Sequence, residues 1–413
     1  MSGTDAKSAI EAVWRIEAPR VIAGVARLVG DVGLAEELAQ DALVAALEQW
    51  PAEGVPRNPG AWLMTTAKRR GIDTIRRQRV LEKHLPALAP QEHTDASEFD
   101  AVLEQEPIED DLLRLIFTAC HPVLKQESRV ALTLRLLGGL STDEIARAFL
   151  VPDATVGQRI SRAKKTLAEA RVPFELPTGA ARSERLASVL EVIYLIFNEG
   201  YSATAGDDWM RPALCEEALR LGRVLAGLMP AEPEAHGLIA LLEIQASRSA
   251  ARTGVDGEPI MLLDQDRRRW DRLLITRGLA ALERAERLGG GPYTLQASIA
   301  ACHARARTPQ ETDWREIAAR YADLAGLTPS PIVELNRAVA VSMADGPQAG
   351  LAVLEPLLDA PSLRGYHLLP SVRADFLFKL GRTDEARAEF ERAAAMTRNE
   401  RERTLLLNRA AAC

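Results

Sequence analysis

The chain has 413 residues, of which 47% are hydrophobic and 26% charged, and its formal net charge is −7. This length allows two to three domains, and the composition is that of an ordinary globular protein. No stretch approaches the roughly 18 apolar residues that a membrane span requires, and the start lacks the basic and apolar segments of a signal peptide. We therefore expect a cytoplasmic protein that does not contact a membrane.

The abundance of Ala, Leu, Arg and Glu favours helix, so the fold class that we expect is all-α. Residues 8–50 have the periodicity of two or three amphipathic helices. The stretch 31–48 carries an acidic face without a basic residue, formed by Glu36, Glu37, Asp41 and Glu48. Such a face is either an ordinary acidic helix surface or a docking face for a basic partner. We expect Pro51, Pro56 and Pro59 to break this helix, and the next helix to run from near Gly60 to about Val80.

The helix expected after Gly60 is strongly basic, because residues 57–83 hold eight Lys or Arg and two Asp or Glu. A local cluster of positive charge can bind nucleic acid even when the whole chain is acidic. The candidates for phosphate contacts are Lys68, Arg69, Arg70, Arg76, Arg77 and Arg79. Trp62, near the start of this helix, either stacks on an unpaired base or anchors the helix in the core.

Residues 84–107 contain three prolines and no clear periodicity, which predicts a linker. Its acidic character is marked, since residues 91–111 hold nine Asp or Glu and no Lys or Arg. A compact helical block is expected at 108–173.

Within this block the pattern predicts a helix-turn-helix motif. Ser141 and Glu144 fit a capping box, a turn is expected around 150–152, and Asp153 is a candidate cap of the second helix. We expect Val156 and Ile160 to face the core. The candidates for DNA contacts are Thr155 and Gln158 at base edges, and Arg159, Arg162, Lys164 and Lys165 in the major groove or on phosphates.

Residues 180–413 read as paired helices. The strongest repeat, with tetratricopeptide-like spacing, is formed by Ala374, Leu377, Gly381, Ala386, Phe390 and Ala393. Weaker matches are Ile317, Tyr321, Leu324 and Pro329, and then Ala338, Val341, Gly346, Ala349 and Val353. This pattern favours a tetratricopeptide-like array over an irregular helical bundle.

The chain resembles the extracytoplasmic-function (ECF) RNA polymerase sigma factors, in the subgroup with a tetratricopeptide-like C-terminal extension. The resemblance rests on the Pro-Gly-Ala-Trp-Leu run at 59–63, on Ile72-Asp73 followed by Arg76-Arg77, and on the motifs at 197–201 and 262–267. It implies a region-2-like domain at 8–83, a linker at 84–107, a region-4-like domain at 108–173 and a regulatory array at 180–413. Three residues depart from the family pattern: Arg69 replaces an Asn, Leu150 a turn Gly and Gly157 a Lys.

The resemblance implies that the chain binds core RNA polymerase through the acidic face, then recognises and opens promoter DNA. The C-terminal array would modulate this activity, either by packing on the chain's own sigma domains or by binding another protein. Its expected contact residues are Asn198, Glu199, Tyr201, Asp264, Gln265, Asp266 and Arg267. The alternatives are a helix-turn-helix regulator with a tetratricopeptide sensor domain, and a scaffold protein. No catalytic constellation is present, so we expect no enzyme activity, no cofactor and no metal.

Overall fold

The computed structural model describes residues 3–83, 108–203, 209–254 and 257–413, so the linker expected at 84–107 lies outside the described residues. The side chains at 3–8, 78–79, 81–83 and 108–109 are not described either. The regular secondary structure of the described ranges is helical, apart from one isolated bridge between Thr253 and Pro259. The chain forms two units, 1–192 and 193–413, and the boundary falls inside helix α9 (Gly179–Tyr201).

The first part of unit 1 is a three-helix arrangement in which α1 (Gly3–Val29) packs against α2 (Val32–Glu53) and α3 (Pro59–Lys83). Its core contains fully buried apolar side chains from all three helices, among them Ile22, Leu38 and Leu63. The break expected at Pro51, Pro56 and Pro59 is confirmed, since α2 ends at Glu53 and α3 begins at Pro59. Pro51 lies in the last turn of α2, so the hydrogen bond that its missing N–H cannot form belongs to the end of the helix.

The second part of unit 1 contains the helix-turn-helix motif. Its helices are α5 (Ile108–Ala119), α6 (Gln126–Leu136), α7 (Thr142–Phe149) and α8 (Asp153–Glu169), with α6 and α7 packed on α8. The capping box of Ser141 and Glu144 at the start of α7 is confirmed. Asp153 is not a cap, because it is the first residue of α8 and Pro152 takes the cap position. Leu150 ends α7 in the left-handed conformation with φ 50°, where a Gly would fit without strain.

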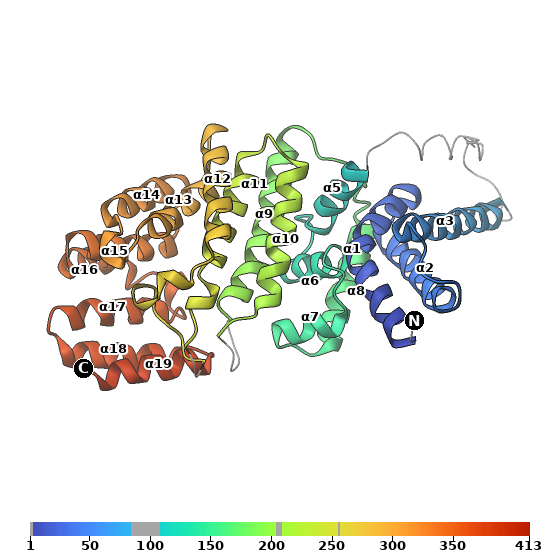
Figure 1. Ribbon diagram of the computed structural model, residues 1–413. Coiled ribbons are helices and arrows are strands. Elements are labelled where there is room, and N and C mark those ends of the chain that lie inside the picture. Colours follow the sequence, from blue (N-terminus) through green and yellow to red (C-terminus); the bar gives the residue numbers. More distant parts are fainter. Residues whose placement is uncertain (1–2, 84–107, 204–208, 255–256) are drawn as a thin grey trace. The chain divides into compact units, whose positions relative to one another are not determined.

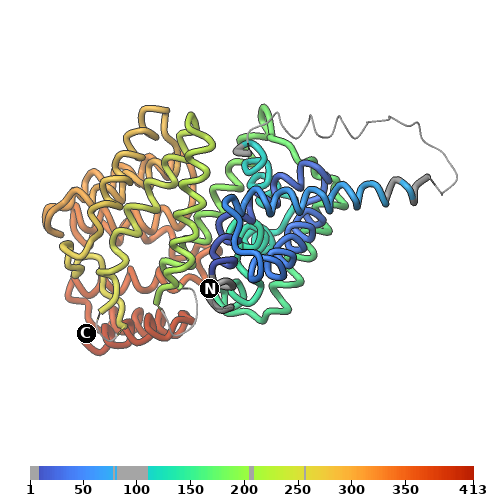
Figure 2. The backbone as a smooth tube through the Cα atoms, turned by 45° about the vertical axis from the view of Figure 1, so that its right-hand side comes forward, coloured from blue at the N-terminus to red at the C-terminus, as the bar shows by residue number. Residues whose placement is uncertain are grey.

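Unit 2 is a succession of helices in which each packs mainly on its neighbours in the chain (Figures 1 and 2). After α9 these are α10 (Pro212–Leu228), α11 (Pro233–Ala246), α12 (Arg272–Arg287), α13 (Pro292–Arg305), α14 (Trp314–Leu327), α15 (Pro331–Asp345), α16 (Pro347–Leu354), α17 (Leu368–Lys379), α18 (Thr383–Met396) and α19 (Glu400–Ala411). Short 3-10 helices lie between several of them, including η1 (Ser249–Ala251), η2 (Leu262–Asp264) and η3 (Arg267–Arg269).

The strongest predicted repeat is the hairpin of α17 and α18. Ala374, Leu377, Ala386, Phe390 and Ala393 are all buried, and Gly381 takes φ 77° in the turn between the two helices.

The weaker match around α15 and α16 omits one small residue at the contact of these helices. A Cβ added to Gly350 would lie 3.0 Å from the carbonyl oxygen of Ala338, so Gly350 allows their close approach.

Candidate nucleic-acid interface

Some cations of helix α3 are exposed to solvent, and others are paired or partly buried. Arg69, Arg76 and Arg77 are exposed. Arg70 Nη1 lies 3.2 Å from Asp41 Oδ2 of α2, in an ion pair that solvent reaches. Lys68 is half-buried, and burial, followed by the charge of Arg27, lowers the pKa of its ammonium group. The side chain of Arg79 lies outside the described residues.

Lys68 and Arg70 therefore already interact with other residues of unit 1. Arg69, Arg76 and Arg77 remain as the part of α3 best able to meet a phosphate backbone.

Trp62 packs edge-on against Trp50 of α2, with the ring centroids 5.3 Å apart and the planes inclined by 70°. Trp50 is 2% exposed, whereas Trp62 is partly buried. This contact favours the interpretation of Trp62 as an anchor for the start of α3.

Helix α8 has a buried face and an open face. Val156 and Ile160 are buried, as the sequence predicted. Gln158 and Arg162 are exposed, while Thr155 and Arg159 are partly exposed. Lys165 is also exposed and lies 3.6 Å from Glu169, one turn further along the helix. The predicted DNA contacts of α8, apart from Lys164, are therefore on its accessible side.

Lys164 is held by Glu36 of α2, which is 3% exposed. Its Nζ lies 2.6 Å from Glu36 Oε2, and Arg135 Nε of α6 donates a hydrogen bond of 2.6 Å to Glu36 Oε1. The expectation that Glu36 belongs to the exposed acidic face is wrong, because these two cations and its neighbours cover it. Glu37, Asp41 and Glu48 are exposed as expected.

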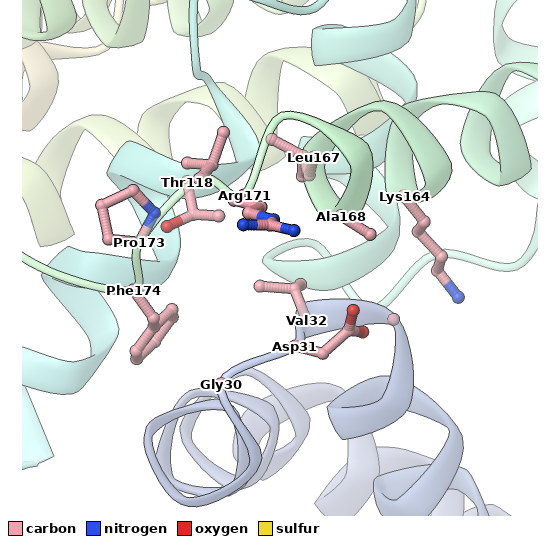
Figure 3. Close-up of a pocket in the computed structure, with 12 residues that line it drawn as sticks. Gly30, Asp31, Val32, Thr118, Lys164, Leu167, Ala168, Arg171, Pro173 and Phe174 are labelled. Atoms are coloured by element: carbon pink, nitrogen blue, oxygen red, sulfur yellow. The ribbon is translucent and has the colours of Figure 1, made fainter. Parts of the chain in front are cut away.

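A cavity of about 300 Å³ lies beside this cluster, between the start of α2 and the end of α8 (Figure 3). Asp31 and Val32 line one side, and Leu167 and Ala168 line the other. The helix-turn-helix part and the three-helix part of unit 1 thus face each other across a partly open contact.

Two further ion pairs bridge the same two parts of unit 1. Arg15 Nη2 of α1 lies 3.1 Å from Glu144 Oε1 of α7, and Arg27 Nη1 of α1 lies 3.6 Å from Asp111 Oδ2 of α5. Sequence reasoning missed the two arginines and Arg135. A signal was present for Glu36, since it flanks the apolar positions Ala35 and Ala39 in the 3–4 spacing of α2.

In unit 2 the motifs at 197–201 and 262–267 divide into buried and exposed residues. Arg252 stacks on the ring of the buried Tyr201, and the Gln265 amide donates to the Ile260 carbonyl. The partly buried Glu199 pairs with Arg211, and Asn198 is also partly buried.

Arg267 is buried and donates to the carbonyls of His303 and Ala306. The exposed members of these motifs are Leu263, Asp264 and Asp266, and Asp266 pairs with Arg268.

Comparison with known proteins assigns these parts. Residues 14–80 match Sigma-70 region 2, residues 114–167 match Sigma-70 region 4, and residues 185–286 match a family of unknown function (DUF6596). "Uncharacterized protein R00370" of Rhizobium meliloti is 46% identical over 390 residues, which cover 93% of this chain and 91% of that protein.

Two relatives carry a functional name. The RNA polymerase sigma-H factor of Pseudomonas aeruginosa is 30% identical over 162 residues, which cover 38% of this chain and 82% of that factor. The "Probable ECF RNA polymerase sigma factor SigI" of Mycobacterium tuberculosis is 26% identical over 163 residues, 40% of this chain and 56% of that protein. The chain therefore belongs to the ECF RNA polymerase sigma factors, in the subgroup with a C-terminal extension. In the described ranges, no helix is both long and apolar enough to cross a membrane.

Proposed function

We propose that this chain binds core RNA polymerase and directs the recognition and opening of promoters, and that it catalyses no reaction itself. The observation that carries the proposal is the pair of open cationic faces, one on α3 in the region-2 part and one on α8 in the region-4 part. Two reading elements on separate domains suit a bipartite promoter. Arg76 and Arg77 would bind the melted element, and Gln158 and Arg162 the upstream element. The chain would act in the cytoplasm.

The polymerase contact would use the exposed part of α2. Glu37, Asp41 and Glu48 supply negative charge, and Val44 and Leu47 among them are 51% and 39% exposed. An apolar centre with an acidic rim suits a basic protein partner.

Glu36 would be released only when the region-4 part moves away from the region-2 part. In the arrangement described, Glu36 binds both Arg135 and Lys164. Polymerase contact by Glu36 and promoter contact by Lys164 would therefore both require this ion pair to open. Glu36 and Lys164 remain proposed contacts of the opened form.

Unit 2 would modulate initiation, either by contacting the chain's own sigma domains or by binding another protein. Its accessible candidates for that contact are Asn198, Asp264 and Asp266, because Tyr201, Gln265 and Arg267 already fill interior positions. The buried residues would support the contact by fixing the backbone of the two motifs.

Reconstituted transcription tests the proposal. The purified full chain is mixed with core polymerase and genomic DNA, and the transcripts are sequenced from their 5′ ends. We expect a set of defined start sites that is absent without the chain. Binding of the chain to duplex DNA without any such start site would instead favour the helix-turn-helix regulator.

A further inference from the structure

Unit 2 contains three arginines that share two aromatic rings, and of these Arg252 and Arg267 are buried and Arg248 is partly buried. The Arg252 guanidinium lies 3.5 Å from the Tyr201 ring centroid, and Arg267 lies 4.9 Å from that of Trp270. Arg248 lies between them, 5.8 Å from the Tyr201 ring and 5.9 Å from the Trp270 ring. Each ring that could stabilise Arg248 thus already accommodates another cation.

No carboxylate forms an ion pair with these three arginines in the described part of the chain, although the charge of Glu311 acts on Arg267. Arg252 donates to the Tyr201 carbonyl, and Arg267 donates to the carbonyls of His303 and Ala306 and to the Thr312 hydroxyl. Arg248 forms no hydrogen bond or ion pair there through its side chain, and its Nε is buried without an acceptor. Charges shielded from water are ordinarily paired, and a guanidinium cannot lose its charge by deprotonation.

The neighbouring polar atoms have the same lack of acceptors. Trp270 is 3% exposed, and its Nε1 is buried without a hydrogen-bond partner. Indole and guanidinium nitrogens only donate, so Arg248 Nε and Trp270 Nε1 are two donors without an acceptor. The positive charge of the cluster also affects His303. Burial, followed by the charges of Arg248 and Arg267, lowers the pKa of His303 to about 3.

The cluster is held in a fixed frame. Arg248 follows the end of α11, and the adjacent Ser247 carbonyl accepts a hydrogen bond of 2.8 Å from the backbone N–H of Asp271, next to Trp270. The Ile260 N–H donates to the Arg252 carbonyl at 2.8 Å. A site whose donors are positioned before the ligand arrives loses little entropy on binding.

We propose that Arg248 and Trp270 form a binding site for an oxyanion, a carboxylate or a phosphate, in the C-terminal unit. The ligand would accept hydrogen bonds from the Arg248 guanidinium, whose forked geometry matches two oxygens of such a group, and from Trp270 Nε1. Tyr201 and Trp270 would flank the bound group. This proposal does not depend on the promoter-opening function proposed above.

Titration of the full chain at constant ionic strength tests the site. The three probes are sodium phosphate, sodium acetate and a tetraglutamate peptide, each balanced with sodium chloride, and the readouts are calorimetric binding and the unfolding temperature. Binding of phosphate or acetate would indicate a small anionic ligand, and binding of the peptide alone would indicate an acidic protein segment. Each of these results supports the site. No response to any of the three probes would overturn it.

The variants decide whether Arg248 carries the binding. We expect Arg248→Gln to weaken binding at least tenfold while the unfolding temperature without anion stays the same or rises, because one of three like charges is removed. The matched control is Arg382→Gln, since Arg382 lies in the same unit but is paired with Glu385, and it should change affinity less than twofold. Should Arg248→Gln fail to fold, Trp270→Phe, which keeps a ring and removes the donor, should weaken binding severalfold. Wild-type affinity in the folded variants would contradict the proposal.

Discussion

Lys164 of the DNA-reading helix α8 and Glu36 of α2 form an ion pair, with Nζ 2.6 Å from Oε2. Arg135 binds the other oxygen of the same carboxylate, so one buried acid joins two cations of the region-4 part to the region-2 part. The side chains of Arg135 and Lys164 are 25% and 22% exposed, which leaves the cluster mostly shielded from water. Glu36, a proposed polymerase contact, and Lys164, a proposed DNA contact, thus bind each other in this arrangement.

Replacing Glu36 should loosen this contact. We expect Glu36→Gln to lower the free energy of unfolding of unit 1 by about 1–3 kcal/mol, because Lys164 and Arg135 lose their shared counter-charge. Hydrogen exchange of the α8 amides should become faster. Urea unfolding with hydrogen exchange measures both effects. The exposed neighbour Glu37→Gln is the control and should change stability by less than about 0.5 kcal/mol. Equal behaviour of the two variants would show that the cluster does not hold the two parts together.

Arg159 and Arg162 should contribute phosphate contacts to upstream promoter binding. Removing each of them should lower the slope of log affinity against log salt by about one. Fluorescence anisotropy with an upstream promoter duplex, measured over a range of salt concentrations, gives the slope. Lys125→Ala, an exposed cation at the start of α6, should leave it unchanged. A slope that is unaffected in Arg159→Ala and Arg162→Ala would mean that α8 does not meet the DNA backbone.

Deleting the C-terminal unit should reduce promoter-dependent transcription. The obvious truncation after Pro177 also removes α9, whose Arg185 Nη2 donates to the Phe117 carbonyl at 3.0 Å and whose Ser188 hydroxyl donates to the Cys120 carbonyl at 2.5 Å. The full-length Arg185→Gln, Ser188→Ala double variant controls for these lost hydrogen bonds and should retain most activity.

A truncated chain with full transcription would leave the C-terminal unit without a role in initiation. A double variant as inactive as the truncation would assign the loss to α9 instead.

Stability of unit 2 should depend on pH through His303. Its pKa in the folded protein, about 3, lies below the ordinary 6.5, so the folded state binds fewer protons than the unfolded state. Its contribution is complete above pH 6.5 and is lost as pH falls towards 3. Between pH 6.5 and 4 this amounts to up to about 3 kcal/mol, at about 1.4 kcal/mol per pH unit. The difference in unfolding free energy between wild type and His303→Gln should therefore shrink on acidification. A difference that stays constant with pH would contradict the shift.

Elements whose contacts lie within one or two neighbouring helices could be predicted from short sequence patterns. The Ser141–Glu144 capping box, the buried positions Val156 and Ile160, and the α17–α18 hairpin follow from spacing within one or two helices. Leu150 was singled out only by the resemblance to the family, which has a Gly at this turn position, and it does adopt a left-handed backbone.

Contacts between distant segments could not be predicted in the same way. Glu36 has the composition of a surface residue, and its burial depends on Arg135 and Lys164, which lie about a hundred residues further along the chain. Lys68 looks like an accessible cation in the sequence, yet packing buries half of it. The cluster around Arg248 joins segments from α9, α11 and η3, and periodicity within any one of them does not indicate it.

Promoter opening with Arg76 and Arg77 reversed tests the central claim most directly. These arginines are exposed on α3, so Arg76→Glu with Arg77→Glu should leave the unfolding temperature unchanged. Potassium permanganate footprinting detects unpaired thymines on a promoter identified in the reconstituted reaction. We expect opening with core polymerase and the wild-type chain, and with a control reversed at the exposed Arg284 and Arg287, but none with the α3 variant. Opening by the α3 variant equal to wild type, or no opening by the wild-type chain, would contradict the account.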